Sequence, residues 1–474
     1  MSCTPNSLCF ETARLLQKRE TPHTDPPIYL HVSDGEDTTS PPTPSKDEED
    51  VVAQDESAAP ALIYPEGGRD AWLVVFGSFS GLLGVLGIMN SVGTFQAYIA
   101  NNQLRDYSEA DIGWIFGLYA FLAFFGGVQV GPIFDTRGPR LLIAAGSALV
   151  LLSTFLLGSC TQYWHFLLVF GLLGGVGTSL MFTPSISSIG HWFMVRRGLA
   201  TGIAICGGGL GGVIYPLMLQ RLFTTTSFAW ATRAMGFTFI LLFAIANLFI
   251  RSRLPPKPGS SVLPSPRVFR SLPFTLTTVG TFFQEWGLFT PITYLTSYAL
   301  HSKSMSTPLA YQLIAIFNAF SVLGRWLPGL IADHVGRYNT MILALLLCAL
   351  SSLALWLPAS ILTASTIASP VLVRNLTIAF AALMGLGSGS NLSLTPVCVG
   401  QLCDTNEYGR YYASCYTVVS FATLTGIPIA GSLVRAAGDE YWAVVVFTGI
   451  CYFVSFGAFT TVRVMKVGWG RGVY

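Results

Sequence analysis

The chain has 474 residues, of which 52% are hydrophobic and 11% are charged, and its formal net charge is +2. A soluble domain carries about 25% charged residues, so a chain this poor in charge cannot cover itself with a water-compatible surface. The near-neutral charge argues against nucleic-acid binding, which needs a concentrated basic face. The nine cysteines stand singly, mostly inside apolar runs, which indicates small apolar side chains rather than disulfides.

The start of the chain differs in composition from the rest. Residues 1–66 are polar and rich in Pro, Ser and Thr, and residues 47–50 form an acidic run. This segment lacks the apolar residues needed for a packed core, so it is predicted to be a disordered tail. It also lacks the apolar centre of a signal peptide.

The remainder is organised into apolar stretches of about twenty residues, the length needed to cross about 30 Å of hydrocarbon. Lipid offers the backbone no hydrogen-bond partner, so each stretch is predicted to be a transmembrane helix. The alternation typical of a membrane barrel strand is absent. The predicted spans cover residues 71–99, 112–134, 141–159, 164–190, 199–222, 232–250, 273–299, 308–332, 338–357, 375–400, 411–434 and 442–463.

The basic residues predict the orientation, because Lys and Arg collect in cytoplasmic loops. With a cytoplasmic amino terminus, the inner loops and the carboxyl tail hold more than twice as many Lys and Arg residues as the outer loops. Both termini are therefore predicted to be cytoplasmic. We expect the plasma membrane, with the vacuolar membrane as the alternative.

An internal repeat divides the spans into two sets. Residues 131–140 after the second span read GPIFDTRGPR, and residues 329–337 after the eighth read GLIADHVGR. The shared pattern G-x-x-x-D-x-x-G predicts an all-α integral membrane fold of twelve transmembrane helices in two pseudo-symmetric six-helix bundles. The predicted parts are the cytoplasmic tail at 1–66, a bundle at 67–250, a cytoplasmic loop at 251–272, a second bundle at 273–465 and a cytoplasmic tail at 466–474.

This repeat resembles the major facilitator superfamily, and three further stretches resemble its monocarboxylate porter family in the fungal form. They are EGGRDAW at 66–72, WFMVRRGLATGIA at 192–204, and the segment from QLCD at 401–404 to GIPIAG at 426–431. The resemblance implies that charged residues of the inner loops lock the two halves together on the cytoplasmic side. A charge pair at a helix end can be made in one transport state and broken in the other, so we expect a gate there. The expected gate residues are Asp135, Arg137, Arg140, Arg196, Arg197, Asp333, Arg337 and Arg410.

Two positions depart from the proton-coupled animal carriers of that family. Those carriers have a Lys in the first span, where this chain has Asn90. They also have an Asp one helical turn before an Arg of the eighth span; here the Arg is Arg325 and the Asp position is Ser321. These departures argue against a simple lactate or pyruvate carrier. Fungal members of the family include vitamin carriers and exporters of secondary metabolites.

Arg325 and Glu285 are the charged side chains that lie deep inside predicted spans. A charge at that depth is costly and usually faces a wet cavity or a partner. Arg325 presents a planar fork of donors that suits a carboxylate, and the alternative is an internal pair with Glu285 or a helix cap. Glu285 is the candidate proton carrier, because burial favours a neutral carboxyl group, and the alternative is a hydrated position near the cytoplasmic end.

Uncharged polar residues near helix breaks complete the predicted substrate site, which should lie near the midplane between the halves. Asn90 and Thr290 hold matching places in the two halves, and Tyr294 follows Thr290 by one turn. Asn318 lies two helical turns before Arg325 on a similar face.

Other patterns are excluded by their context. Residues 207–212 spell GxGxxG, but no strand precedes them, so they predict a small face for close helix packing rather than a nucleotide site. No ATP-binding motif, metal-ligand spacing or nucleophile–base set is present, so we expect no cofactor, no metal and no enzymatic activity. Asn375 begins a candidate glycosylation sequon on the predicted outer side, whereas the sequon at Asn391 lies inside a span.

These features predict a secondary transporter that moves a small organic solute through the lipid bilayer by alternating access, as a monomer. We favour a carboxylated metabolite, including export of a fungal secondary metabolite. One alternative is a proton-coupled importer of a monocarboxylate or a vitamin. A non-transporting nutrient sensor is the alternative from another class.

Overall fold

The computed structural model describes residues 64–107, 109–254, 266–363, 369–470, 472 and 474. These residues belong to one unit that begins at residue 63, and they contain helices and connecting turns with no strand. Most of the predicted tail and the middle of the predicted central loop lie outside the described residues.

The first set of helices corresponds to the first six predicted spans. It consists of α3 (Gly68–Asn90), α4 (Val92–Asn101), α5 (Glu109–Phe125), α6 (Gly127–Arg137), α7 (Arg140–Leu157), α8 (Tyr163–Phe166), η1 (Leu167–Gly174), α9 (Gly175–Ser187), η2 (Ser188–His191), α10 (Arg197–Thr225) and α11 (Phe228–Phe249).

The second set corresponds to the last six predicted spans. It consists of η3 (Pro266–Arg270), α12 (Leu272–Ser302), α13 (Thr307–Val335), α14 (Arg337–Ser351), η4 (Ser352–Trp356), α15 (Leu357–Thr363), α16 (Pro370–Val399), η5 (Thr405–Glu407), α17 (Tyr408–Ala436) and α18 (Trp442–Val467).

Eleven helical segments of the described residues are long and apolar enough to cross a membrane. The remaining predicted span, residues 273–299, lies within the continuous helix α12, which has 31 residues. At about 1.5 Å per residue, this helix is also long enough to cross the hydrocarbon. Its many threonines, together with Gln284 and Glu285, make it more polar than the other eleven segments.

The first predicted span is broken at Ser91, which separates α3 from α4. The Ser91 hydroxyl and amide both donate to the carbonyl oxygen of Gly87, at 2.7 and 3.1 Å. A serine that bonds the preceding turn competes with the helical ladder and often bends the chain. The second predicted span is interrupted at Gly126, between α5 and α6.

Buried hydrophobic residues form two main cores, one mostly among α3 to α11 and the other mostly among α12 to α18. The two sets of helices meet along two seams, where α10 packs on α13 and α17 packs on α5 and α6. Within the first set, the glycine run of α10 lies against α3, because a Cβ on Gly207 or Gly211 would collide with a backbone carbonyl of that helix. This contact agrees with the predicted small packing face.

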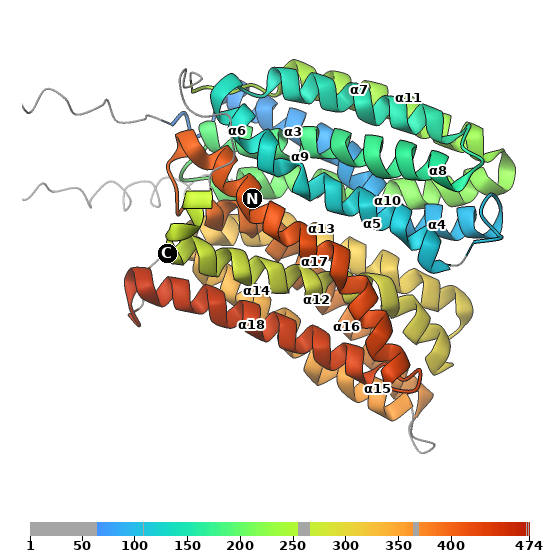
Figure 1. Cartoon of the computed structure of the whole chain (residues 1–474). Helices are drawn as coiled ribbons and strands as arrows, with labels where there is room; N and C mark the ends of the chain where they lie inside the picture. The colour runs from blue at the N-terminus through green and yellow to red at the C-terminus, as the bar shows by residue number, and fades with distance from the viewer. Residues whose placement is uncertain (1–63, 108, 255–265, 364–368, 471, 473) are drawn as a thin grey trace, which may run out of the picture. The chain divides into compact units, whose positions relative to one another are not determined.

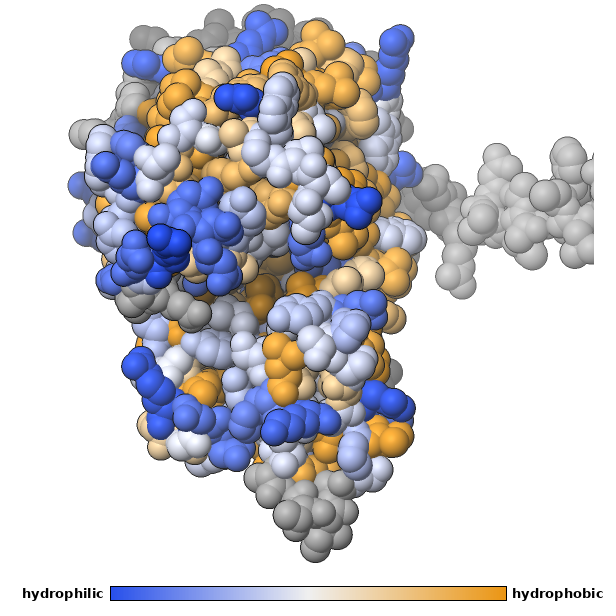
Figure 2. Space-filling view, turned by 90° about the vertical axis from the view of Figure 1, so that its right-hand side faces the viewer, coloured by the Kyte–Doolittle hydropathy of each residue, from blue (hydrophilic) through white to orange (hydrophobic). Residues whose placement is uncertain are grey.

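Figure 1 shows the first set of helices above the second, with the ends of α6, α13 and α18 on the side of the chain termini. Figure 2 views the unit from the opposite end, where α4, α8 and α15 lie. The surface at that end is hollowed between the upper and lower sets, and hydrophobic residues are visible inside the hollow. The two sets are therefore parted at the end away from the termini.

Candidate transport gate and solute site

Asp135, near the end of α6, binds the start of a helix from the other half. Its carboxylate accepts hydrogen bonds from the backbone amides of Gly409 and Arg410, at 3.0 and 2.8 Å. These amides belong to the first turn of α17. The first N–H groups of a helix have no partner within it, and the helix dipole favours an anion at that end. Asp135 therefore joins the two halves as a helix cap.

Asp333, near the end of α13, makes the same contact in the opposite direction. Its two carboxylate oxygens accept from the amides of Gly198 and Leu199, each at 2.9 Å. Those amides open α10, which belongs to the first half. The two aspartates of the repeat thus form a reciprocal pair of caps across the seams.

The glycines of the repeated motif permit this close approach. A Cβ on Gly131 would collide with the carbonyl oxygen of Gly409, and a Cβ on Gly329 would collide with that of Gly198. Any side chain at these positions would push the helices apart. The motif therefore supplies both the carboxylate and the flat surface on which the opposing helix rests.

Two of the expected basic residues also bridge the halves. Arg197 is buried and stacks over the ring of Tyr408, with its guanidinium carbon 4.0 Å from the ring centre. It also donates to the carbonyl oxygen of Gly400, at 3.4 Å. Arg337 donates to the carbonyl oxygen of Met194. Both arginines therefore strengthen the contact at the end where the aspartates lie.

The other expected basic residues are placed differently. Arg410 contributes its backbone amide to the cap at Asp135. The side chains of Arg137, Arg140 and Arg196 are exposed, and within the described part of the chain they make no hydrogen bond or ion pair. The two carboxylates thus take backbone amides as their hydrogen-bond partners, although the sequence pattern had suggested pairing with arginines.

Sequence reasoning missed a further contact at this end, made by the residues just before α3. The Glu66 carboxylate accepts from the amides of Met194, Val195 and Arg196, at 2.7, 2.8 and 3.0 Å. The hydroxyl groups of Tyr64 and Thr405 lie 2.5 Å apart, which links the same segment to the second half. The only signal in the sequence was the acidic residue of the EGG stretch.

Arg325 lies on α13 in the seam with α10. It is 4% exposed, and one terminal nitrogen donates to the carbonyl oxygen of Ile205 at 2.9 Å. Its Nε has no hydrogen-bond partner among the described residues. The guanidinium therefore has a structural contact with the opposite half and an unused donor. It makes no ion pair with Glu285 in the described part of the chain, so the internal pair considered above is absent.

The other predicted solute residues do not gather around Arg325. Asn90 is exposed and donates to the carbonyl oxygen of Gly208 at 3.0 Å, on the side of α10 that faces α3. Thr290 is buried and donates to the carbonyl of its own helix. Tyr294 donates to Ile427 of α17 at 3.3 Å, and Asn318 is half-buried on α13. Among the described residues, no hydrogen bond joins members of this set.

Glu285 lies in the middle of α12 and is 2% exposed. Its Oε1 has no hydrogen-bond partner among the described residues. This burial contradicts the hydrated position considered as an alternative.

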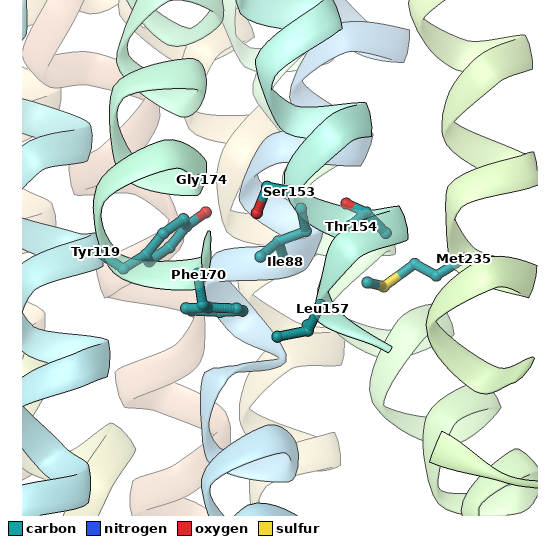
Figure 3. A pocket seen from close by; sticks show the side chains of 8 residues that line it. All are labelled: Ile88, Tyr119, Ser153, Thr154, Leu157, Phe170, Gly174 and Met235. Carbon is teal, nitrogen blue, oxygen red and sulfur yellow. The ribbon is translucent and has the colours of Figure 1, made fainter. Parts of the chain in front are cut away.

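A small pocket inside the first core is too small for a metabolite (Figure 3). Its volume of about 10 Å³ is roughly what one water molecule needs. The hydroxyl of Tyr119 lies 3.1 Å from that of Thr178, and Ser153 donates to Val169 at 2.7 Å, so both groups have protein partners. The pocket is lined by Ile88, Tyr119, Ser153, Thr154, Leu157, Phe170, Gly174 and Met235.

The candidate sequon lies on α16. Asn375 is exposed, but Thr377 is buried and its hydroxyl donates to Val373 at 2.8 Å. The folded chain therefore presents only the asparagine of the sequon.

Long apolar helices in two sets, locked by reciprocal caps at one end and parted at the other, define a multi-pass membrane transporter. The family model of the Major Facilitator Superfamily matches residues 71–374. The chain belongs to this superfamily.

Relatives and a solved structure agree with that assignment. An MFS-type transporter of Gibberella moniliformis is 38% identical over 83% of this chain and 90% of its own. A riboflavin transporter of Saccharomyces cerevisiae is 34% identical, covering 92% and 84%. An aspyridones efflux protein of Emericella nidulans is 35% identical, covering 90% and 85%. The fold matches a bacterial homologue of the iron transporter ferroportin with a TM-score of 0.64, at 12% identity over 84% of this chain and 100% of the other.

Proposed function

We propose that this transporter exports a carboxylated metabolite by alternating access. The observation that carries the proposal is Arg325, a buried permanent cation in the seam with an unused Nε donor. A buried guanidinium is well suited to a carboxylate, because its planar fork can donate two parallel hydrogen bonds.

The direction of transport is proposed from the relatives. The printed name of the Emericella nidulans relative is an efflux protein for aspyridones, and that of another relative, from Gibberella fujikuroi, is an efflux protein for fujikurins. Import of a vitamin is the second candidate, favoured by the riboflavin transporter at 34% identity.

The gate is proposed to be the cytoplasmic one, with Asp135 and Asp333 closing it while the opposite end is open. This orientation follows from the excess of Lys and Arg on the side of the aspartates. It gives a plasma-membrane protein with both termini in the cytoplasm and two bundles, at 67–250 and 273–465, acting as a monomer.

The test compares an acid with its ester. The acid is first identified as the metabolite whose export is lost on deletion of the gene. Membrane vesicles then receive the acid or its methyl ester, with wild type, Arg325→Gln and Arg325→Lys. Arg221→Gln, an exposed position on α10, is the matched control.

Losing the buried cation should cost about 2–5 kcal/mol of binding for the acid, on the order of thirtyfold or more in affinity. Lysine should restore only part of it, because it lacks the fork. The ester should be insensitive to both changes, since it has no carboxylate to lose. If acid and ester suffer equally, Arg325 is structural and the carboxylate proposal fails.

A further inference from the structure

Five polar side chains in the second core are buried without adequate partners. They lie on α12, α16 and α18, and each is at most 2% exposed. Buried polar groups nearly always have partners, so unpartnered ones point to a bound water or ion. The atoms without a hydrogen-bond partner among the described residues are both amide atoms of Gln284, Oε1 of Glu285, Oδ1 of Asn391, Oη of Tyr452 and Oγ of Ser455.

Several contacts connect these groups. A Cβ on Gly287 would lie 2.7 Å from the Tyr452 ring, so α12 and α18 are in direct contact beside Glu285. Tyr452 interacts electrostatically with both Glu285 and Cys348. The Asn391 amide nitrogen lies 3.6 Å from the Cys348 sulfur, which leaves the amide oxygen unpartnered. The four helices α12, α14, α16 and α18 thus bring Glu285, Tyr452 and Asn391 into one neighbourhood.

The surroundings of Glu285 contain no positive charge. The titratable groups that interact with it are Cys415 and Tyr416 from α17 and Tyr452 from α18. Arg325 instead interacts with Cys206 of α10. A carboxylate buried among tyrosines and cysteines would be an uncompensated charge, which is costly unless a cation neutralises it.

We propose that Glu285, Gln284, Asn391 and Tyr452 enclose a hydrated site for one small monovalent cation, separate from Arg325. The carboxylate supplies the single negative charge, and the amide and hydroxyl oxygens are the ligands that hard cations prefer. Water satisfies the Gln284 amide nitrogen, which a cation cannot. Occupation by sodium and occupation by a proton on Glu285 place the same charge here. The use of this ion to drive transport rests on the proposed function, but its binding does not.

The experiment measures the thermal unfolding of the purified full-length protein without any solute. Sodium, lithium and choline chlorides are compared at constant ionic strength, and the series is repeated from acid to alkaline pH. The variants are Glu285→Gln, which removes the charge with little change of shape, and Tyr452→Phe, which removes one oxygen. Asp439→Asn is the control, because Asp439 is an exposed carboxylate with a positive φ of 65°, which asparagine tolerates.

If sodium is the ion, sodium raises the Tm of wild type above its value in choline, and the effect grows with the logarithm of the concentration. Glu285→Gln abolishes the rise, and Tyr452→Phe lowers the apparent sodium affinity about tenfold. If a proton is the ion, the Tm is the same in all salts. It then falls with rising pH more steeply in wild type than in Glu285→Gln, because the folded state holds the extra proton.

Equal responses of wild type and Glu285→Gln to both salt and pH would overturn the proposal. If Glu285→Gln does not fold, unchanged responses in Tyr452→Phe overturn it instead. The assay uses neither acid nor ester, so it can succeed when the Arg325 test fails, and the reverse.

Discussion

Replacing Asp333 with Asn should loosen the closed gate without unfolding the protein. The carboxylate accepts two backbone hydrogen bonds at 2.9 Å from the first turn of α10. Asparagine has one acceptor oxygen in place of two, and it has no charge to interact with the helix dipole. Hydrogen bonds to charged groups are worth about 1.5–3 kcal/mol, and the dipole adds about 0.3–1 kcal/mol at exposed sites.

Asp333 is only half-buried, so we take about 2 kcal/mol for the change. That value corresponds to a roughly thirtyfold shift from closed toward open. Asp135→Asn should act similarly through α17, since its two bonds are equivalent. The two substitutions lie at separate seams, so their effects should add.

The assay measures the distance across the gate by pulsed electron paramagnetic resonance in lipid nanodiscs. Spin labels are placed at Leu141 on α7 and Val335 on α13, which are both exposed at that end. The long-distance population should rise in each variant and rise further in the double variant. Asp404→Asn is the control, because this exposed carboxylate precedes η5 but makes no cap hydrogen bond.

Unchanged distances in Asp333→Asn and Asp135→Asn would refute the role of the caps. Equal changes in Asp404→Asn would show that any lost negative charge at this face suffices. Either result would leave the glycine contacts and Arg197 as the structural lock.

Three further predictions concern the same end of the molecule. Tags at both termini should be reachable only from the cytoplasm, and labelling on intact cells would contradict the orientation. Gly202→Ala should favour the open gate by about 1–3 kcal/mol in the same distance assay, because its Cβ would collide with the Arg325 carbonyl, whereas Gly113→Ala has open space and should have no effect. Glu66→Gln should also increase the open population, since it weakens three hydrogen bonds to the loop before α10, and a wild-type distribution would refute that role.

Hydropathy predicted the helices well because the membrane demands a long apolar run from each of them. The break at Ser91 was missed, since a hydroxyl that returns to Gly87 is not distinguished by hydropathy from one that faces a neighbour. The repeat correctly singled out Asp135 and Asp333 as residues at the contact between the halves. It could not identify their partners, because backbone amides leave no side-chain signature.

The solute site was harder to predict because it depends on which face of a neighbouring helix each residue meets. Asn90 and Arg325 both contact the glycine run of α10, but Asn90 bonds Gly208 on one side and Arg325 lies beside Gly209 on another. Linear spacing cannot separate these two faces. Gln284, Asn391 and Tyr452 were missed for a related reason, since they come from three distant helices and form a cluster only in the folded core.

The glycine contacts that fix α10 to α3 have a parallel in the other half, where a Cβ on Gly324 or Gly385 would collide with a backbone carbonyl across the α13–α16 contact. Each seam helix is therefore coupled to an inner helix of its own half and should tilt with it as a stiff lever. On α10 the stretch beyond Gly209 is about 24 Å long, at about 1.5 Å per residue. A tilt of about 10° at the seam would thus move its far end by about 4 Å. Small changes at the two aspartate caps would in this way become large changes in the width of the opposite opening.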